Sequence, residues 1–193
     1  MQNQCIDGIQ VVGVDPSLRH WGISKGIYNV KTQNLHIYDV ATIEPVLSTG
    51  KQVRQNSLDL ESAKQLCEAM LKATQGAKAI FVEIPIGSQS ARAMAGYGIC
   101  VGVLGALRAT GIPFFEITPT EVKVASVGYK NATKAEMIQW ATTAHPEANW
   151  PTYKQHGKDV ISAALAEHQA DSIGAIYAGL ASNQFKQIAP FIS

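Results

Sequence analysis

Cysteine is scarce in this sequence, with only Cys5, Cys67 and Cys100 among 193 residues. The three lie far apart and form no C-x-x-C pair, so a zinc knuckle is excluded, and their odd number does not suggest a disulfide framework. A reducing compartment fits this usage best, and we therefore expect a cytoplasmic protein.

An excess of charge of either sign is also missing. The 16 Lys and Arg residues stand against 15 Asp and Glu residues, which leaves a net charge of +1. This balance excludes the binding of nucleic acid by bulk positive charge, although it permits a local basic patch.

Long hydrophobic runs are absent as well. The longest nearly uncharged stretch, between Arg92 and Arg108, is shorter than the roughly 18 to 20 residues that span a bilayer. The opening residues MQNQCIDG lack the basic and apolar regions of a signal peptide. We expect no membrane partner.

The composition is that of an ordinary globular chain, with 46% hydrophobic and 16% charged residues. No repeat, low-complexity tract or interdomain linker interrupts it. We therefore expect a single domain over residues 1–193 with a sizeable core.

The first part of the chain predicts three strands. Residues 9–15, IQVVGVD, form a short Val-rich run that ends at a Pro-Ser turn, as a buried strand does. Residues 22–30 and 35–43 alternate in part and contain β-branched and aromatic side chains. An antiparallel meander is the natural interpretation.

Helices and strands alternate after the meander, which implies parallel crossovers and a mixed five-stranded α/β sheet flanked by helices. The expected order is helix, strand, helix and strand, at residues 51–75, 77–85, 88–110 and 112–117.

The remaining third is expected to be mostly helical. Residues 118–143 read as two short helices, with a capping box from Thr133 to Glu136. Residues 145–157 are rich in turn formers and read as a loop, and a last helix is expected to run to about Ser182.

Four glycines interrupt the predicted helix at 88–110, where Ser88 is a plausible N-cap. Each glycine costs a helix interior about 1 kcal/mol relative to Ala, so something is expected to approach the helix closely. The neighbour is either the sheet or an external partner, a second subunit or DNA. These glycines are Gly96, Gly98, Gly102 and Gly105.

Two carboxylates end predicted strands. Asp15 closes the first strand, although an Asp-Pro-Ser sequence is also a common turn, and Glu83 closes the fourth after four apolar residues. A buried carboxylate is costly unless it is paired or metal-bound. If the two strands are neighbours, about 4.8 Å apart, the carboxylates can share a cation.

His168 and Asp171 are three positions apart, so on a helix they share one face. Alone, such a pair more often faces solvent at a helix start. Together with Asp15 and Glu83, the pair forms a pattern that is far more specific than any one of the four residues alone.

The motifs GVDPSLRHWGIS, FVEIP, TPTEVKVASVGYKNATKAEM and HQADSIGAIYAG resemble the RuvC family of Holliday junction resolvases, which have the ribonuclease H-like fold. The resemblance covers residues 9–179. It implies an active site of Asp15, Glu83, His168 and Asp171 in a histidine variant.

The resemblance further implies a metal-dependent endonuclease, a homodimer that cuts four-way DNA junctions symmetrically. Hard oxygen ligands suit two Mg²⁺ ions, with Mn²⁺ able to substitute. His168 either ligates an ion or orients the attacking water. The expected phosphate-binding side chains are Lys123, Lys134, Arg92 and Lys130, with Arg19, Lys51 and Arg54 as possible additions.

The chain departs from the family in three places. Ser17 replaces a usual Gly, and Ile86 stands where some members have a junction-stacking aromatic. The segment 148–167 is longer than in bacterial housekeeping members, which is compatible with a phage-encoded relative. Three aromatics either stack on exposed bases or belong to the core, namely Trp21, Tyr97 and Tyr129.

Other functions stay open at this point. A broader branched-DNA or RNA–DNA hybrid nuclease would use the same residues, and a non-catalytic DNA-binding module would keep only the fold. An actin-like sugar kinase is disfavoured, because 193 residues provide one lobe without Gly-rich phosphate loops.

Overall fold

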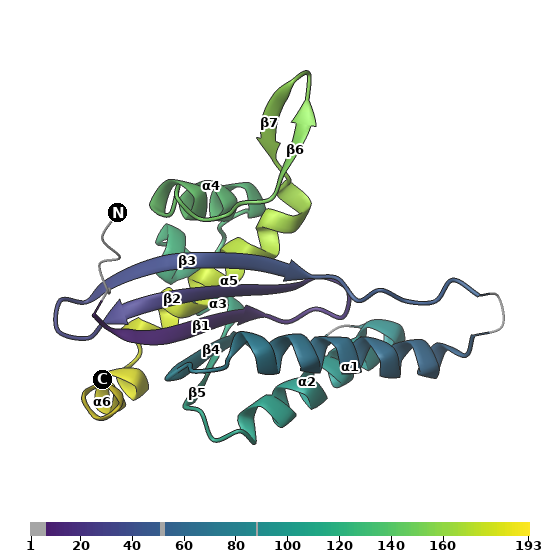
Figure 1. Ribbon diagram of the computed structural model, residues 1–193, viewed down its shortest axis with the longest axis horizontal. Helices are drawn as coiled ribbons and strands as arrows, with labels where there is room; N and C mark the ends of the chain where they lie inside the picture. The colour runs from purple at the N-terminus through teal and green to yellow at the C-terminus, as the bar shows by residue number, and fades with distance from the viewer. Residues whose placement is uncertain (1–6, 51–52, 88) are drawn as a thin grey trace.

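A computed structural model describes residues 7–50, 53–87 and 89–193. Cys5, Lys51 and Ser88 lie outside the described residues. The centre of the molecule is a five-stranded mixed sheet in the order β3-β2-β1-β4-β5 (Figure 1). Its strands are β1 Ile9–Asp15, β2 Trp21–Asn29, β3 Asn34–Ile43, β4 Ala79–Glu83 and β5 Phe114–Ile117.

The predicted topology is confirmed. Strands β1, β2 and β3 form the antiparallel meander, and β4 and β5 join β1 in parallel. The predicted ribonuclease H-like α/β class agrees with this arrangement.

Helices cover both faces of the sheet. Helices α1 Gln55–Ala73 and α2 Ala91–Arg108 lie side by side on one face, and α5 Ala163–Ala181 crosses the other. Two shorter helices, α3 Pro119–Val127 and α4 Lys134–Ala144, pack on the outside of α5. The predicted capping box at Thr133 is present and starts α4.

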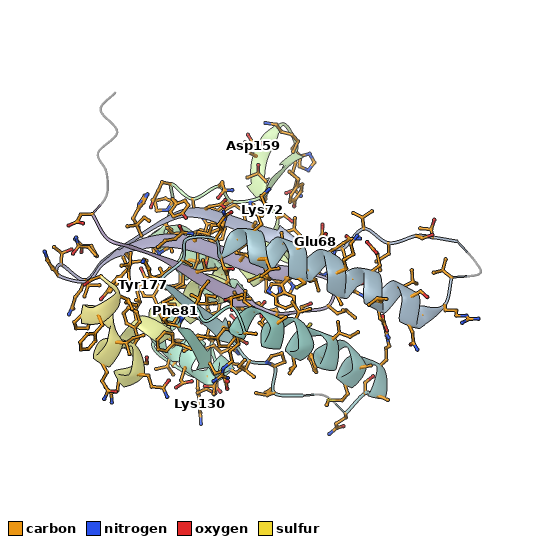
Figure 2. The ribbon with its side chains drawn as sticks, turned by 60° about the horizontal axis from the view of Figure 1, so that its bottom comes forward. Glu68, Lys72, Phe81, Lys130, Asp159 and Tyr177 are labelled. Atoms are coloured by element: carbon orange, nitrogen blue, oxygen red, sulfur yellow. The ribbon has the colours of Figure 1, made fainter. Side chains whose placement is uncertain are left out.

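The alternation of side chains along β1 and β4 creates one core on each face. Val11 and Phe81 point into the core under α5, whereas Val12 and Ile80 point into the core under α1 and α2. Figure 2 shows Phe81 inside the layered body. Because both faces are buried, β1 and β4 read as continuous apolar runs rather than as alternating ones.

The structure corrects the expectation for residues 145–157. Instead of a loop only, the chain forms an antiparallel hairpin of β6 Thr152–Gln155 and β7 Lys158–Ile161. This hairpin is a separate two-stranded sheet that stands away from the body.

A final helix, α6 Asn183–Ile192, was not predicted either. The hydroxyl of Ser182 caps it by accepting a hydrogen bond from the Phe185 amide. Phe185 is buried against the core beneath α5. The signal was available, because apolar residues recur at helical spacing after Ser182.

Of the two neighbours considered for the α2 glycines, the sheet is excluded for three of them and an external partner stays open. A Cβ at Gly96 would meet only the side chain of Leu18, at 3.4 Å, and one at Gly98, Gly102 or Gly105 would meet nothing within 4 Å. Within the described chain, the close neighbour predicted for these three glycines is therefore missing. No helix in the described ranges is long and apolar enough to cross a membrane.

Candidate active site

The sheet register brings the two strand-end carboxylates together. Strands β1 and β4 are parallel neighbours with Val14 opposite Val82. The next residues are Asp15 and Glu83, which therefore lie side by side at the carboxyl edge of the sheet. The predicted adjacency of the first and fourth strands is thus observed.

Helix α5 adds the other two predicted side chains, but not from its start. His168 and Asp171 are the sixth and ninth residues of α5, in its second and third turns. The H-x-x-D spacing had suggested that both residues stand at the start of a helix. This is wrong, because the helix begins at Ala163, directly after its N-cap Ser162. The solvent-facing alternative is also wrong, because the His168 side chain is only 20% exposed.

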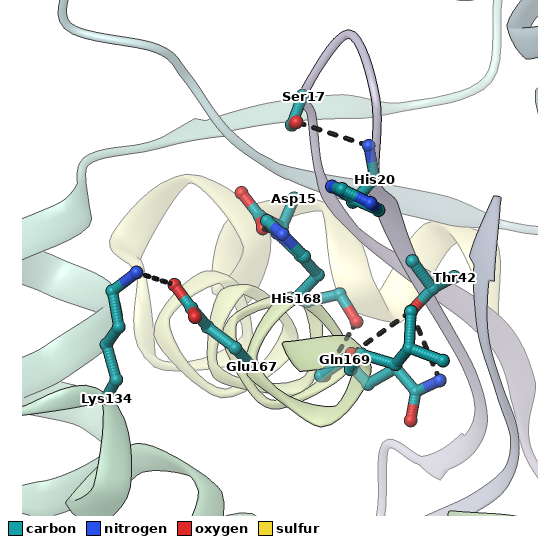
Figure 3. A network of polar contacts seen from close by, with 10 residues as sticks. Asp15, Ser17, His20, Thr42, Lys134, Glu167, His168 and Gln169 are labelled. Carbon is teal, nitrogen blue, oxygen red and sulfur yellow. Dashed lines mark hydrogen bonds and ion pairs between the residues drawn. The ribbon is translucent and has the colours of Figure 1, made fainter. Parts of the chain in front are cut away.

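Close contact between α5 and the sheet fixes the position of His168. A Cβ at Gly22 of β2 would lie 2.0 Å from the His168 carbonyl oxygen, so only glycine permits this approach. The Thr42 hydroxyl donates a hydrogen bond to the Leu165 carbonyl at 3.1 Å and accepts one from the Gln169 amide at 3.3 Å (Figure 3). Both contacts tie the first turns of α5 to β3.

His168 and Asp15 are directly hydrogen bonded. The distance from His168 Nδ1 to Asp15 Oδ2 is 2.7 Å, and both side chains are mostly buried. This hydrogen bond raises the pKa of His168 above its ordinary value, while burial opposes the shift. The imidazole therefore compensates part of the negative charge at this edge.

Little nearby positive charge stabilises the ionised forms of the other two carboxyl groups, Glu83 and Asp171. Burial, reinforced by the charges of Asp15 and Asp171, raises the pKa of Glu83 to about 9. Burial and the charge of Asp15 likewise raise the pKa of Asp171 to about 7. The ammonium of Lys123 opposes both shifts. All four predicted residues thus belong to one electrostatic cluster.

The cluster opens into a pocket of about 760 Å³. The four predicted residues line it together with the Pro16–His20 turn, the start of α2 and Glu167. The pocket is therefore large enough to admit a phosphodiester and its neighbouring sugars.

Two pocket residues were missed by the sequence reasoning. The ring of His20 stacks on that of His168, with centroids 5.7 Å apart, and its Nε2 lies 3.0 Å from Glu44. Glu167 also lines the pocket and raises the pKa of Asp171. His20 lies inside the motif GVDPSLRHWGIS and Glu167 directly precedes HQADSIGAIYAG, but nothing in the sequence shows which way their side chains point.

The predicted DNA-binding side chains differ in their surroundings. Lys134 is paired with Glu167 at 2.5 Å, beside the cluster. Arg92 lines the pocket, and its guanidinium makes two hydrogen bonds to Asp59, of 2.7 and 2.6 Å. Lys130 is exposed and projects from the body in Figure 2.

The three aromatic residues considered for base stacking differ in their burial and surroundings. Trp21 is fully buried under α1 and α2, so the suggestion that it stacks on bases is wrong. Tyr97 lines the pocket. Tyr129 is 44% exposed and donates a hydrogen bond to Glu136. Ile86, at the position of the stacking aromatic, is 84% exposed at the pocket rim.

The donor chemistry of the cluster suits a hard divalent cation. Three carboxylates and one imidazole converge there. Burial and the neighbouring carboxylates raise the pKa values of Glu83 and Asp171, and a bound cation would favour their ionised forms. Among the described residues, however, no three acidic, imidazole or thiol groups are arranged to hold an ion as they stand. The hydrogen bond between His168 and Asp15 uses one of the two carboxylate oxygens of Asp15.

Solved structures share this fold. Thermus thermophilus RuvC matches with a TM-score of 0.62 and 20% identity over 89% of this chain and 93% of that chain. The same protein in complex with a Holliday junction substrate matches with a TM-score of 0.61 and 18% identity, over 89% and 92% of the two chains.

Two further matches come from a eukaryote and a virus. The yeast mitochondrial Holliday junction resolvase Ydc2 matches with a TM-score of 0.54 and 14% identity, over 94% of this chain and 84% of that chain. The fowlpox virus Holliday junction resolvase gives 0.52 and 11%, over 89% and 98%. No protein-family model and no curated protein matches the sequence. The chain has the fold of RuvC and of these other resolvases.

Proposed function

We propose that this protein is a metal-dependent, structure-selective endonuclease that resolves four-way DNA junctions by paired, symmetric phosphodiester cleavage. The observation that carries the proposal is the convergence of Asp15, Glu83, His168 and Asp171 in one pocket. The shared fold supports it, because Thermus thermophilus RuvC and the fowlpox virus resolvase were both solved with Holliday junction DNA.

Asp15, Glu83 and Asp171 are proposed to hold the metal, and His168 to act beside them. Two divalent ions, Mg²⁺ or Mn²⁺, when bound there supply an activated water and stabilisation of the leaving oxygen. Asp15 lies beside Glu83 and contacts His168, so it would be the central ligand of the set. Glu83 and Asp171 would ligate as carboxylates and must lose their protons to do so.

His168 has one ring nitrogen engaged by Asp15 and the other directed away from that bond. His168 is proposed either to ligate an ion or to orient the attacking water. The close packing of its backbone carbonyl on Gly22 holds this turn of α5 against β2 for both roles.

Cationic side chains around the pocket are proposed to bind the DNA backbone. Lys123 already interacts electrostatically with Glu83 and Asp171, so it is close enough to neutralise a phosphate placed at the site. Lys134 is proposed to exchange Glu167 for a phosphate, and Arg92 and Lys130 to bind phosphates farther along the strand.

Two symmetric cuts require two active sites related by a two-fold axis, which a homodimer provides. The open face of α2 is the proposed contact, since Gly98, Gly102 and Gly105 leave room there for close approach of a second backbone. Val101 on the same helix is 52% exposed.

The test is a cleavage assay with an end-labelled four-way junction, a fork, a linear duplex and an RNA–DNA hybrid, each with Mg²⁺, Mn²⁺ or EDTA. Paired nicks in the junction that need metal and are absent from Asp15→Asn are expected. Cutting of forks or hybrids instead would refute the junction assignment, and binding without cleavage would favour a non-catalytic module.

A further inference from the structure

The β6–β7 hairpin is a projecting element that the proposed catalytic machinery does not use. Its strands pair only with each other and join no other sheet. Figures 1 and 2 both show it standing away from the layered body, with Asp159 on the projecting ribbon. It therefore contributes little to the core.

The root of the hairpin is firmly held. The Ser162 amide donates to the Pro151 carbonyl at 2.8 Å and so joins the hairpin base to the N-cap of α5. Just before the hairpin, the Asn149 side chain accepts a hydrogen bond from the Val40 amide at 2.8 Å, and Trp150 Nε1 donates to the His145 carbonyl at 2.9 Å. The base of the hairpin is thus anchored to the N-cap of α5, to β3 and to the C-cap of α4.

The tip of the hairpin is also well defined. His156 and Gly157 have φ values of 48° and 77°, the left-handed pair of a two-residue type I′ turn. This turn matches the twist of the strands and favours a rigid ribbon over a floppy loop. A preorganised element binds a partner with less loss of conformational entropy.

The surface chemistry points to a nucleic acid partner. All four β6 side chains are exposed, as are His156 and Lys158. Residues 152–161 contain two lysines and one aspartate, so ten residues hold the same net charge of +1 as the whole chain. Lys154 pairs with Asp159 at 2.8 Å in an exposed contact, which costs little to exchange for a phosphate.

We propose that the β6–β7 hairpin binds the duplex DNA arm next to the cleavage site, contacting phosphates through Lys154 and Lys158. The inference rests on the proposed function. A two-stranded ribbon fits the B-DNA major groove, which is about 12 Å wide and about 8.5 Å deep. Strands of four residues project about 14 Å, which exceeds that depth.

The geometry also limits where on the DNA the hairpin acts. His168 is five residues into α5, about 8 Å along the helix axis from its first residue. The ribbon adds about 14 Å to this distance of about 8 Å, so the tip of the hairpin lies within about 22 Å of His168 along this path. At about 3.4 Å per base pair, the contacted phosphates lie within about seven base pairs of the crossover.

The experiment compares Lys154→Gln/Lys158→Gln with the charge-matched control Lys31→Gln/Lys186→Gln. The control lysines are exposed and lie on the β2–β3 turn and on α6, at the opposite end of the molecule. Junction binding is measured against salt concentration. We expect the hairpin variant to bind several-fold more weakly and its log–log salt slope to fall by about 2, one unit per lost phosphate contact. The control is expected to keep the original slope.

A second arm of the experiment uses junctions with uncharged methylphosphonate linkages. When these replace the phosphates about four to seven base pairs from the crossover, the native protein and the hairpin variant should bind equally. When they are placed at the crossover only, the difference should persist. Two results would overturn the proposal. One is an equal salt slope for the native protein and the hairpin variant on the unmodified junction. The other is that the two proteins bind equally only when the methylphosphonate linkages stand at the crossover.

Failure of the proposed function gives a different result. A protein that binds plain duplex with a slope that depends on Lys154 and Lys158, but cleaves no junction, retains the hairpin assignment and loses the resolvase assignment. A protein that binds neither junction nor duplex at any salt concentration refutes both. Thermal unfolding of each variant checks that the fold is intact.

Discussion

Replacing Glu83 with glutamine is expected to stabilise the metal-free protein at alkaline pH. The pKa of this carboxyl is about 9 in the folded chain, against 4.5 ordinarily. Between these values the native state keeps a proton that the unfolded state has lost, so the stability of the protein falls as pH rises. Glutamine has nearly the same shape and does not titrate, so Glu83→Gln loses this dependence.

The magnitude follows from the shift. Each pH unit between the two pKa values corresponds to about 1.4 kcal/mol, so between about pH 5.5 and about pH 8.5 the native protein loses at most about 4 kcal/mol through this group. Relaxation of the site reduces the loss, and we expect about 2 to 4 kcal/mol. The variant is therefore predicted to be the more stable protein at the higher pH.

The assay is urea unfolding in EDTA at the two pH values, with Glu68→Gln as control. Glu68 is an exposed carboxylate on α1, and its removal should leave the pH dependence unchanged. Saturating Mg²⁺ should restore stability at high pH to the native protein and not to Glu83→Gln, because a bound cation favours the ionised carboxylate. Parallel pH dependences of native and Glu83→Gln protein in EDTA would refute the reasoning.

Four further changes have distinct expected outcomes. Gly22→Ala should lower the unfolding free energy by more than 2 kcal/mol and slow cleavage, because its Cβ would meet the His168 carbonyl. Gly98→Ala, whose Cβ meets nothing within 4 Å in the single subunit, should raise the unfolding free energy of the monomer by about 1 kcal/mol. Glu167→Gln releases Lys134 from its ion pair and should tighten junction binding in filter-binding assays, and weaker binding would contradict this. His168→Asp should move the acidic limb of cleavage at limiting Mg²⁺ to lower pH, because protonated imidazole no longer competes with the metal, and an unchanged limb would count against this.

The sequence predicted the sheet because strong local signals agreed there. Val11 to Val14 and Ala79 to Val82 are buried on both faces and read as continuous apolar runs, whose strand ends mark the site. The hairpin has no such signal. No side chain of β6 is buried, and the pairing of its strands depends on the left-handed turn at His156 and Gly157. Periodicity detects burial, and an exposed ribbon has none.

The site was predictable to the level of residues but not of orientation. Asp15 and Glu83 follow from strand ends, and the spacing of His168 and Asp171 places them on one helix face. The stacking of His20 on His168 depends on how a turn from one part of the chain folds over a helix from another. Spacing within one segment carries no information about such a contact.

A histidine at position 168 has a physical consequence for the empty cluster. Burial raises the pKa values of Glu83 and Asp171, and the charges of neighbouring carboxylates, Asp15 among them, add to both shifts. A fourth carboxylate would add to these shifts, whereas His168 donates to Asp15 and becomes more basic in doing so. The imidazole thus lowers the electrostatic cost of keeping Asp15 ionised in the metal-free cluster. The bond uses Oδ2 of Asp15, and the second carboxylate oxygen is proposed to bind the cation, so His168 can keep this contact and hold Asp15 in place when metal binds.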